Sequence, residues 1–368
     1  MSAASPHLTT AGRRGSAGRP GRPGPGTPAW LLCTFPAACL AVTLLAACGG
    51  GGPGAQPGPA ATVTVTPGAQ AVPSASPPVA PAAVVPPGMI AVTTGGALVV
   101  LSPVTGAVAR TLVPGGVTGD EISVSPDGAT VYFAAGKPCA SRIESVPSAG
   151  GVPVKIAAGT LPAVSPDGLR LAFAAGTCDA SQVPSLLIRT LGSGADRKYP
   201  MVPSGQYSGL PDPISHLSWA ADSRRLAVSI ASPEDNEGWN LMILDTQVAS
   251  YYLTGPGTAS VPVTGEPNTR DSYLREGVFM PDGDLFVSRA CCAGFPVKNT
   301  SRLMWEVGTS GAEIHQVAIG FASLDHTSLD ASADGHWLLY LAGSDLYVSH
   351  DGATPRRLAA GLIAAAWG

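Results

Sequence analysis

Four of the seven cysteines in this 368-residue chain stand in loop-like segments where they could form disulfide bonds. Cys139 and Cys178 follow similar sequences, FAAGKPC and FAAGTC, whereas Cys291 and Cys292 are neighbours in the chain. An even number of cysteines in an exported domain favours disulfides. We therefore expect a Cys139–Cys178 bridge and a vicinal bond between Cys291 and Cys292. Free thiols, an intermolecular bond and a metal site are the alternatives for the second pair.

A run of acidic and amide side chains, from Glu234 to Glu237, offers oxygen ligands of the kind that Ca²⁺ prefers. A continuous acidic loop is more often simply solvated, so Ca²⁺ is only a secondary expectation. The sequence contains no glycine-rich phosphate loop, no G-x-S-x-G turn and no H-E-x-x-H helix. We therefore assign no catalytic residue, no metal ligand and no cofactor, and a metal-dependent hydrolase or lactonase is kept as an alternative function.

Composition narrows the class of partner. The chain has 21 basic and 25 acidic residues, a net charge of -4, and only 12% charged residues. A nucleic-acid-binding domain normally carries a strongly basic face, so this class is excluded. We expect a monomer that binds an envelope protein or polymer. A sensor of a glycan or of a small ligand is a further alternative.

The elements that must position these residues are repeats of an apolar strand, a tight turn and a second apolar strand. Copies occur at 121–136, 161–176, 216–231, 277–290 and 329–343, at intervals typical of four-stranded blades. In the turns, Pro sets φ for a type I turn, and Gly supplies the left-handed residue that follows. We interpret these turn residues as structural: Pro126, Asp127, Gly128, Pro166, Asp167, Gly168, Asp222, Pro281, Asp282, Gly283, Asp334 and Gly335. Their flanking strands alternate enough to be half-buried, with Val131 and Phe133 on the face opposite Tyr132.

The two ends of the repeat region decide the number of blades. Residues 89–113 supply a second, third and fourth strand without a first, and residues 362–368 supply a first strand alone. Further strand pairs are expected at 239–255 and 345–361. Joining the C-terminal strand to the N-terminal blade removes two exposed sheet edges. The prediction is an all-β, six-bladed propeller of four-stranded antiparallel blades over residues 88–368.

The copies VSPDGATVYFAAG and VSPDGLRLAFAAG resemble the repeat of TolB-like propellers, which are related to WD-type repeats. The likeness is good at Met280–Gly283 and weaker at Asp222 and Asp334, where the proline is missing. The resemblance implies a propeller with a tendency to bind or scaffold, but it names no ligand, since one fold carries many functions. It also places His216 and His326 near the starts of strands that line a central channel.

Loops between second and third strands share one propeller face with the links between blades, and this face carries the longest segments, at 202–213, 232–239, 255–273 and 291–300. Function on a rigid scaffold usually lies on such loops. The candidate ligand-binding residues are Tyr207, Glu234, Asp235, Glu237, Trp239, Arg270, Asp271, Tyr273, Arg275 and Phe295.

The N-terminal segment reads as an export signal. Residues 1–28 carry four arginines and no acid, and residues 29–47 are apolar. The run ends in Leu45-Ala46-Ala47-Cys48, which resembles the lipobox of bacterial lipoproteins and implies cleavage before a lipidated Cys48. Residues 48–87 are rich in Gly, Pro and Ala, which is typical of a disordered tether. We expect a signal peptide (1–47), a tether (48–87) and a propeller held on the extracytoplasmic side of the cell membrane. A cleaved signal without lipid, or an uncleaved membrane helix, is the alternative.

Overall fold

The computed structural model describes residues 88–137, 140–175, 185–200, 214–231, 239–248, 260–263, 273–290, 303–309, 312–318 and 326–368. All of them belong to one compact unit, 78–368, of the two units into which the chain divides. Every regular element in these ranges is a β-strand. None of the described residues forms a helix that could cross a membrane. The signal, Cys48 and the tether lie outside the described ranges, so those expectations stay untested.

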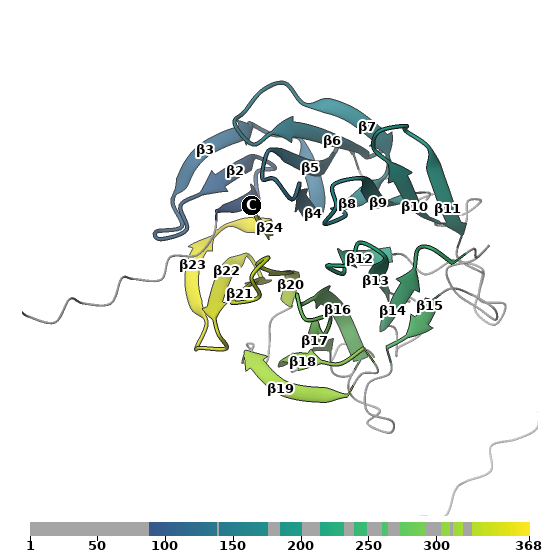
Figure 1. Cartoon of the computed structure of the whole chain (residues 1–368). Coiled ribbons are helices and arrows are strands. Elements are labelled where there is room, and N and C mark those ends of the chain that lie inside the picture. Colours follow the sequence, from purple (N-terminus) through teal and green to yellow (C-terminus); the bar gives the residue numbers. More distant parts are fainter. Residues whose placement is uncertain are drawn as a thin grey trace, which may run out of the picture. The chain divides into compact units, whose positions relative to one another are not determined.

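The strands form six four-stranded antiparallel sheets arranged as blades around a ring (Figure 1). We name each blade from its inner to its outer strand. The first is β24 (Leu362–Trp367), β1 (Met89–Thr93), β2 (Leu98–Leu101) and β3 (Val108–Val113). The second is β4 (Val117–Val124), β5 (Thr130–Ala135), β6 (Arg142–Pro147) and β7 (Val154–Ala158). The third is β8 (Thr160–Val164), β9 (Arg170–Ala175), β10 (Ser185–Thr190) and β11 (Asp196–Pro200).

The fourth blade is β12 (Ile214–Trp219), β13 (Arg225–Ala231), β14 (Trp239–Asp245) and β15 (Ser260–Pro262). The fifth is β16 (Tyr273–Phe279), β17 (Leu285–Ala290), β18 (Leu303–Val307) and β19 (Glu313–Ala318). The sixth is β20 (His326–Ala331), β21 (Trp337–Ala342), β22 (Asp345–His350) and β23 (Arg356–Ala360). The predicted fold class, with six blades of four strands, is confirmed.

The ring closes as the sequence predicts, with the last strand in the first blade. β24 pairs with β1 in antiparallel register, from Met89 opposite Trp367 to Val92 opposite Ala364. In Figure 1 the yellow β24 lies beside the blue strands, so the two ends of the repeat region meet. This closure covers the inner edge of β1.

The second strand of each blade is more buried than its sequence alternation predicts. Val131, Tyr132 and Phe133 in β5 are all buried, and every residue of β21 is buried. The expectation of half-buried strands is therefore wrong for these elements. Neighbouring blades pack face to face, so both faces of an inner strand are covered, and a continuous apolar run is what such a strand requires.

The inner turns have the chemistry that their sequences predict. Asp127 accepts hydrogen bonds from the Ser125 hydroxyl and the Ala129 amide at 2.6 and 3.0 Å, and Gly128 has φ of 69°. Hydrogen bonding to Ser125 and to backbone amides holds the pKa of Asp127 below its usual value. In the fourth blade the turn survives without Gly, because Ser223 itself adopts a φ of 54°. These bonds are the ones that a hairpin turn requires, and the purely structural role of the turn acids stays a prediction.

One predicted strand is misplaced. The fourth strand of the fourth blade was expected within 250–255, but β15 pairs Ser260–Pro262 with β14. Residues 249–259 lie outside the described ranges. The segment 255–273 is therefore not a single loop between blades, because part of it completes a sheet.

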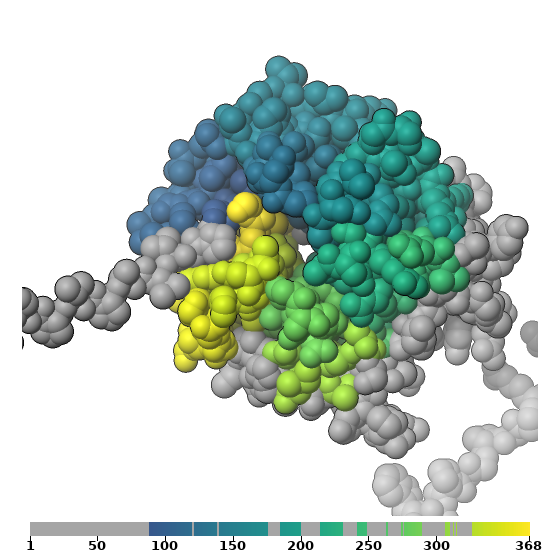
Figure 2. Space-filling model, viewed as in Figure 1, coloured from purple at the N-terminus to yellow at the C-terminus, as the bar shows by residue number. Residues whose placement is uncertain are grey.

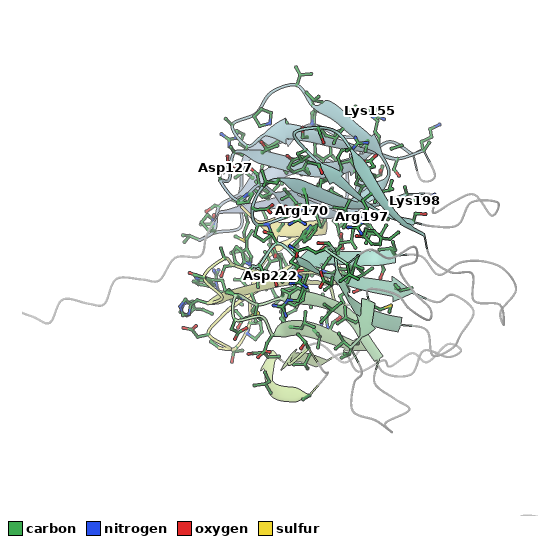
Figure 3. The ribbon with its side chains drawn as sticks, turned by 45° about the vertical axis from the view of Figure 1, so that its right-hand side comes forward. Asp127, Lys155, Arg170, Arg197, Lys198 and Asp222 are labelled. Carbon is green, nitrogen blue, oxygen red and sulfur yellow. The ribbon has the colours of Figure 1, made fainter. Side chains whose placement is uncertain are left out.

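Arginines join neighbouring blades at their edges. Arg197 on β11 donates to the carbonyls of Thr246 and Val248 at 2.8 and 2.9 Å, and Arg170 on β9 donates to the Thr246 hydroxyl at 3.2 Å. Figure 3 shows both arginines at this boundary, with Asp222 on the fourth blade nearby. These guanidinium groups satisfy carbonyls at the chain turns and hold the third blade against the fourth.

Candidate functional site

The six inner strands β24, β4, β8, β12, β16 and β20 surround the axis of the ring (Figure 1). Three of them carry a polar side chain two residues before the first residue of the inner turn: Ser123, Ser218 and Asp330. Each accepts a hydrogen bond from a backbone amide on the next inner strand. The distances are 2.9 Å from Val164 to Ser123, 3.1 Å from Phe279 to Ser218, and 2.9 Å from Trp367 to Asp330.

Comparison of these three equivalent bonds shows which part of the Asp330 interaction the fold requires. Ser123 and Ser218 make the bond between blades with a neutral hydroxyl, so the bond itself does not require a charge. Asp330 makes the same bond with a carboxylate, whose other oxygen accepts from the Ala331 amide at 2.9 Å. The negative charge at this position therefore exceeds what the fold needs.

A buried ion pair is formed by the residues that lie two positions before Ser123 and Ser218 in the chain. Glu121 on β4 and His216 on β12 are 8% and 6% exposed, and Nδ1 of His216 pairs with a Glu121 carboxylate oxygen. The same Glu121 oxygen accepts from the Leu217 amide at 3.3 Å. Burial alone would lower the pKa of His216, but the charge and hydrogen bond of Glu121, with the charges of Glu276 and Asp330, raise it to about 9. His216 is therefore an imidazolium at neutral pH.

Asp330 has an unusual affinity for a proton. Burial raises its pKa to about 6, although the Trp367 and Ala331 amides and the charge of His216 act in the opposite direction. Acids with shifted pKa values in concave sites are frequent at functional sites. At neutral pH Asp330 is mainly ionised, and it takes up a proton in mildly acidic conditions.

These groups line a funnel-shaped cavity of about 780 Å³ at the channel axis, on the face that carries the inner turns. We call it the funnel. Figure 2 shows the ring hollowed at its centre, between its yellow, blue and green parts. Its wall contains Glu121, His216, Ser218 and Asp330, with Asp127 and Asp334 at the rim. A concave site of this volume, with a few convergent polar groups, is typical of ligand binding.

Replacing Asp330 by Ser is expected to stabilise the unliganded protein by about 1–3 kcal/mol at pH 7. The folded-state pKa lies above the usual value, so the ionised carboxylate opposes folding above pH 6. The serine retains an acceptor for Trp367, as in the second and fourth blades. The gain should shrink as the pH falls from 7 to 4, because folded Asp330 becomes protonated. Urea unfolding at both pH values measures the difference.

Ser218→Ala is the control, because it removes the equivalent bond between blades without removing a charge. It should cost about 0.5–1.5 kcal/mol at either pH. If Asp330→Ser lowered stability at pH 7 by a similar amount, Asp330 would be a structural residue only.

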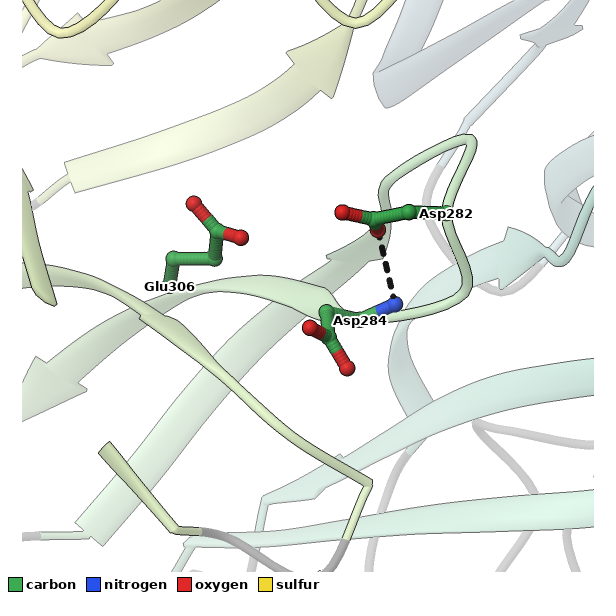
Figure 4. Close-up of side chains that lie close together, drawn as sticks. All are labelled: Asp282, Asp284 and Glu306. Atoms are coloured by element: carbon green, nitrogen blue, oxygen red, sulfur yellow. Dashed lines mark hydrogen bonds between the residues drawn. The ribbon is translucent and has the colours of Figure 1, made fainter. Parts of the chain in front are cut away.

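A second group of acids lies outside the funnel. Asp282, Asp284 and Glu306 have carboxylate oxygens within 4.8 Å of one another (Figure 4). Asp282 also accepts from the Asp284 amide at 3.0 Å, the same bond that the other turn acids make. Among the described residues this is the cluster with metal-ligand spacing, but the turn accounts for Asp282 without an ion.

Most residues predicted for ligand binding lie outside the described ranges: Tyr207, Glu234, Asp235, Glu237, Arg270, Asp271 and Phe295. The cysteines Cys48, Cys139, Cys178, Cys291 and Cys292 also lie outside them, so lipidation and disulfides stay predictions. Trp239, Tyr273 and Arg275 fall in β14 and β16, and nothing is described of their side chains. Of the two channel histidines, His216 lies in the funnel wall, whereas His326 is buried edge-on to Tyr340 with ring centroids 5.4 Å apart.

Three acidic residues, Glu121, Glu276 and Asp330, are not among the residues that the sequence predicted for the site. All three are acids within the apolar first strand of a repeat, and first strands were expected to line the channel. Inspecting those strands for acids, and not for histidines alone, would have found them.

Comparisons with solved structures support the fold. The chain superposes on TolB from Acinetobacter baumannii with a TM-score of 0.54 and 13% identity, over 76% of this chain and 65% of that one. The superposition on a putative TolB from Agrobacterium tumefaciens has a TM-score of 0.50 and 12% identity, and it covers 76% of this chain and 91% of that one. The chain has a TolB-like six-bladed propeller fold. It spans about two thirds of the length of the Acinetobacter protein, and at this identity the likeness concerns the fold alone. No family model and no curated protein sequence matches the chain.

Proposed function

We propose that this protein is an extracytoplasmic binding or scaffolding lipoprotein, anchored by lipid at Cys48, whose propeller holds an envelope protein or polymer. The observation that carries the proposal is the funnel, where Glu121, His216 and Asp330 gather at the axis of the ring. Buried charge opposes folding unless something compensates it, so its presence in an open cavity supports a ligand. The TolB-like fold agrees with a binding role without specifying it.

The funnel opens on the face of the short inner turns, whereas the loops singled out in the sequence are predicted to lie on the other face. We propose the funnel as the main contact and the loop face as a second one. Segment 264–272 can be shortened to test that face without removing β15, which ends at Pro262.

Site-specific photocrosslinking in membranes of the native host tests the function. A photoreactive residue at Ala333, an exposed position at the funnel rim, is expected to capture a partner, and one at Val152, which is 84% exposed but outside the funnel, is not. The same partner should be lost when unlabelled protein competes. Cys48→Ser serves as the anchoring control and is expected to leave the membrane fraction. If the residue at Ala333 captures nothing specific, and shortening segment 264–272 releases no partner from the membrane-bound protein, the binding function is wrong.

A hydrolase is the second candidate, because Asp330 holds a proton up to about pH 6 beside the His216 imidazolium. Paired groups of this kind serve general acid–base catalysis. Within the described residues, the acids with metal-ligand spacing lie outside the funnel, which does not support a metal-dependent reaction there. Release of products from envelope fractions by wild type, abolished in Asp330→Ser, would favour this candidate over scaffolding.

A further inference from the structure

The charge of the funnel wall is negative on balance. Its carboxylates are Glu121, Asp127, Asp330 and Asp334, and none of its described lining residues is Lys or Arg. His216 is the one basic group among them, and it is paired with Glu121. A cavity lined by one sign of charge concentrates ions of the opposite sign. The wall therefore attracts cations and repels anions.

The arginines nearest this face are engaged elsewhere. Arg170 lies over the Trp219 ring, 5.1 Å from its centroid, and bonds to Thr246 and Asp167. Arg225 pairs with Asp222 at 2.7 Å. These two arginines are therefore committed to other partners than Asp330.

Two residues that line the funnel each carry a buried donor with no hydrogen-bond partner in the part of the chain that the structure describes. They are Nε2 of His216 and Nε1 of Trp367, and both residues are more than nine-tenths buried. A buried donor without an acceptor costs about 1–3 kcal/mol, so native proteins leave few of them. An oxygen acceptor would satisfy each of these donors, and a positive charge would compensate the carboxylates.

We infer that the funnel binds a ligand that combines an ammonium or guanidinium group with carbonyl oxygens, as a basic residue in a peptide segment does. The positive group pairs with Asp330, and the oxygens accept from the His216 and Trp367 donors. The inference rests on the proposed binding function and specifies its ligand. A free amine is the other source of the same positive charge, and the experiment below separates the two.

Calorimetric titration of the full chain, purified in detergent, tests the ligand class with three probes. Acetyl-Gly-Lys-Gly-amide carries the charge and the carbonyls, acetyl-Gly-norleucine-Gly-amide carries the carbonyls alone, and n-butylamine carries the same single charge alone. The lysine peptide should bind at least tenfold more tightly than the norleucine peptide, and binding should weaken with added salt. Stronger binding of n-butylamine than of the lysine peptide would identify a free amine as the source.

Asp330→Ser should weaken binding of the lysine peptide at least tenfold, whereas Asp282→Asn should change it less than twofold. Asp282→Asn removes the same charge from an inner turn outside the funnel and keeps an acceptor for the Asp284 amide. Affinity should also fall as the pH drops below about 6, when Asp330 gains a proton.

Equal binding of the lysine and norleucine peptides, or unchanged binding by Asp330→Ser, would overturn the inference. So would the absence of binding by either cation up to about 1 mM, the range of weak specific affinity. The crosslinking experiment tests the proposed binding function independently of these titrations. A partner crosslinked from Ala333 and still captured by Asp330→Ser would contradict only the charge assignment.

Discussion

His216→Leu is expected to destabilise the propeller by about 3–5 kcal/mol at pH 7, which is a large part of the stability of a typical domain. The substitution leaves the Glu121 carboxylate buried without its cation, in a region where Glu276 and Asp330 add charge of the same sign. Removing one member of a buried pair costs far more than removing both. Urea unfolding followed by tryptophan fluorescence measures the loss.

The double variant Glu121→Gln/His216→Leu is the matched control, because it removes both charges. It should recover most of the lost stability and give a coupling energy of about 2 kcal/mol or more in a double-mutant cycle. If the two single substitutions were additive, the pair would contribute nothing beyond its separate side chains.

The pH dependence of wild type provides an independent check on the same pair. The folded-state pKa of His216 is raised to about 9, so its contribution to stability is fully present below pH 6.5 and is lost as the pH rises through 9. His216→Leu should lack this loss. A wild-type stability that stayed level from pH 6.5 to 9.5 would contradict the assignment.

Deleting residues 362–368 should abolish cooperative folding. These residues form β24, which buries Leu362, Ala364, Ala365, Ala366 and Trp367. Its loss would expose apolar surface of the first and last blades and leave the inner edge of β1 unpaired. The cost, more than about 5 kcal/mol, matches the whole stability of many domains. Thermal unfolding followed by circular dichroism is the measurement.

The same strand placed at the other end of the propeller should restore folding. The Gly368 amide donates to the Gly88 carbonyl at 2.8 Å, so the end of β24 lies beside the start of β1. Inserting residues 362–368 before Gly88, with Asn-Gly between the two glycines, gives a hairpin with a favoured two-residue turn. A relocated strand that carries Leu362→Ser and Trp367→Ser should not restore cooperative folding. If it succeeded equally, or if the simple deletion folded normally, closure by β24 would not stabilise the ring.

Much of the fold follows from local chemistry that a sequence displays. The Ser-Pro-Asp-Gly copies encode their turns through Asp127 and its equivalents, whose side chains bond within three residues. The incomplete sets of strands at 89–113 and 362–368 predicted closure, because pairing them with each other leaves neither end with an exposed sheet edge. The fourth strand of the fourth blade could not be placed in the same way, since three residues, Ser260–Pro262, carry too short a pattern.

By itself the sequence determined the fold class and the number of blades. The repeats and their turns depend on residues close in the chain, and the two incomplete ends of the repeat region complete one blade when they pair with each other. Tertiary structure decided the candidate site. Glu121 and His216 are 95 positions apart, and Asp330 a further 114, so only the closed ring brings their charges together. The same ring buries both faces of β5 and β21. It also shows that Asp330 makes the same bond between blades as Ser123 and Ser218, which carry no charge.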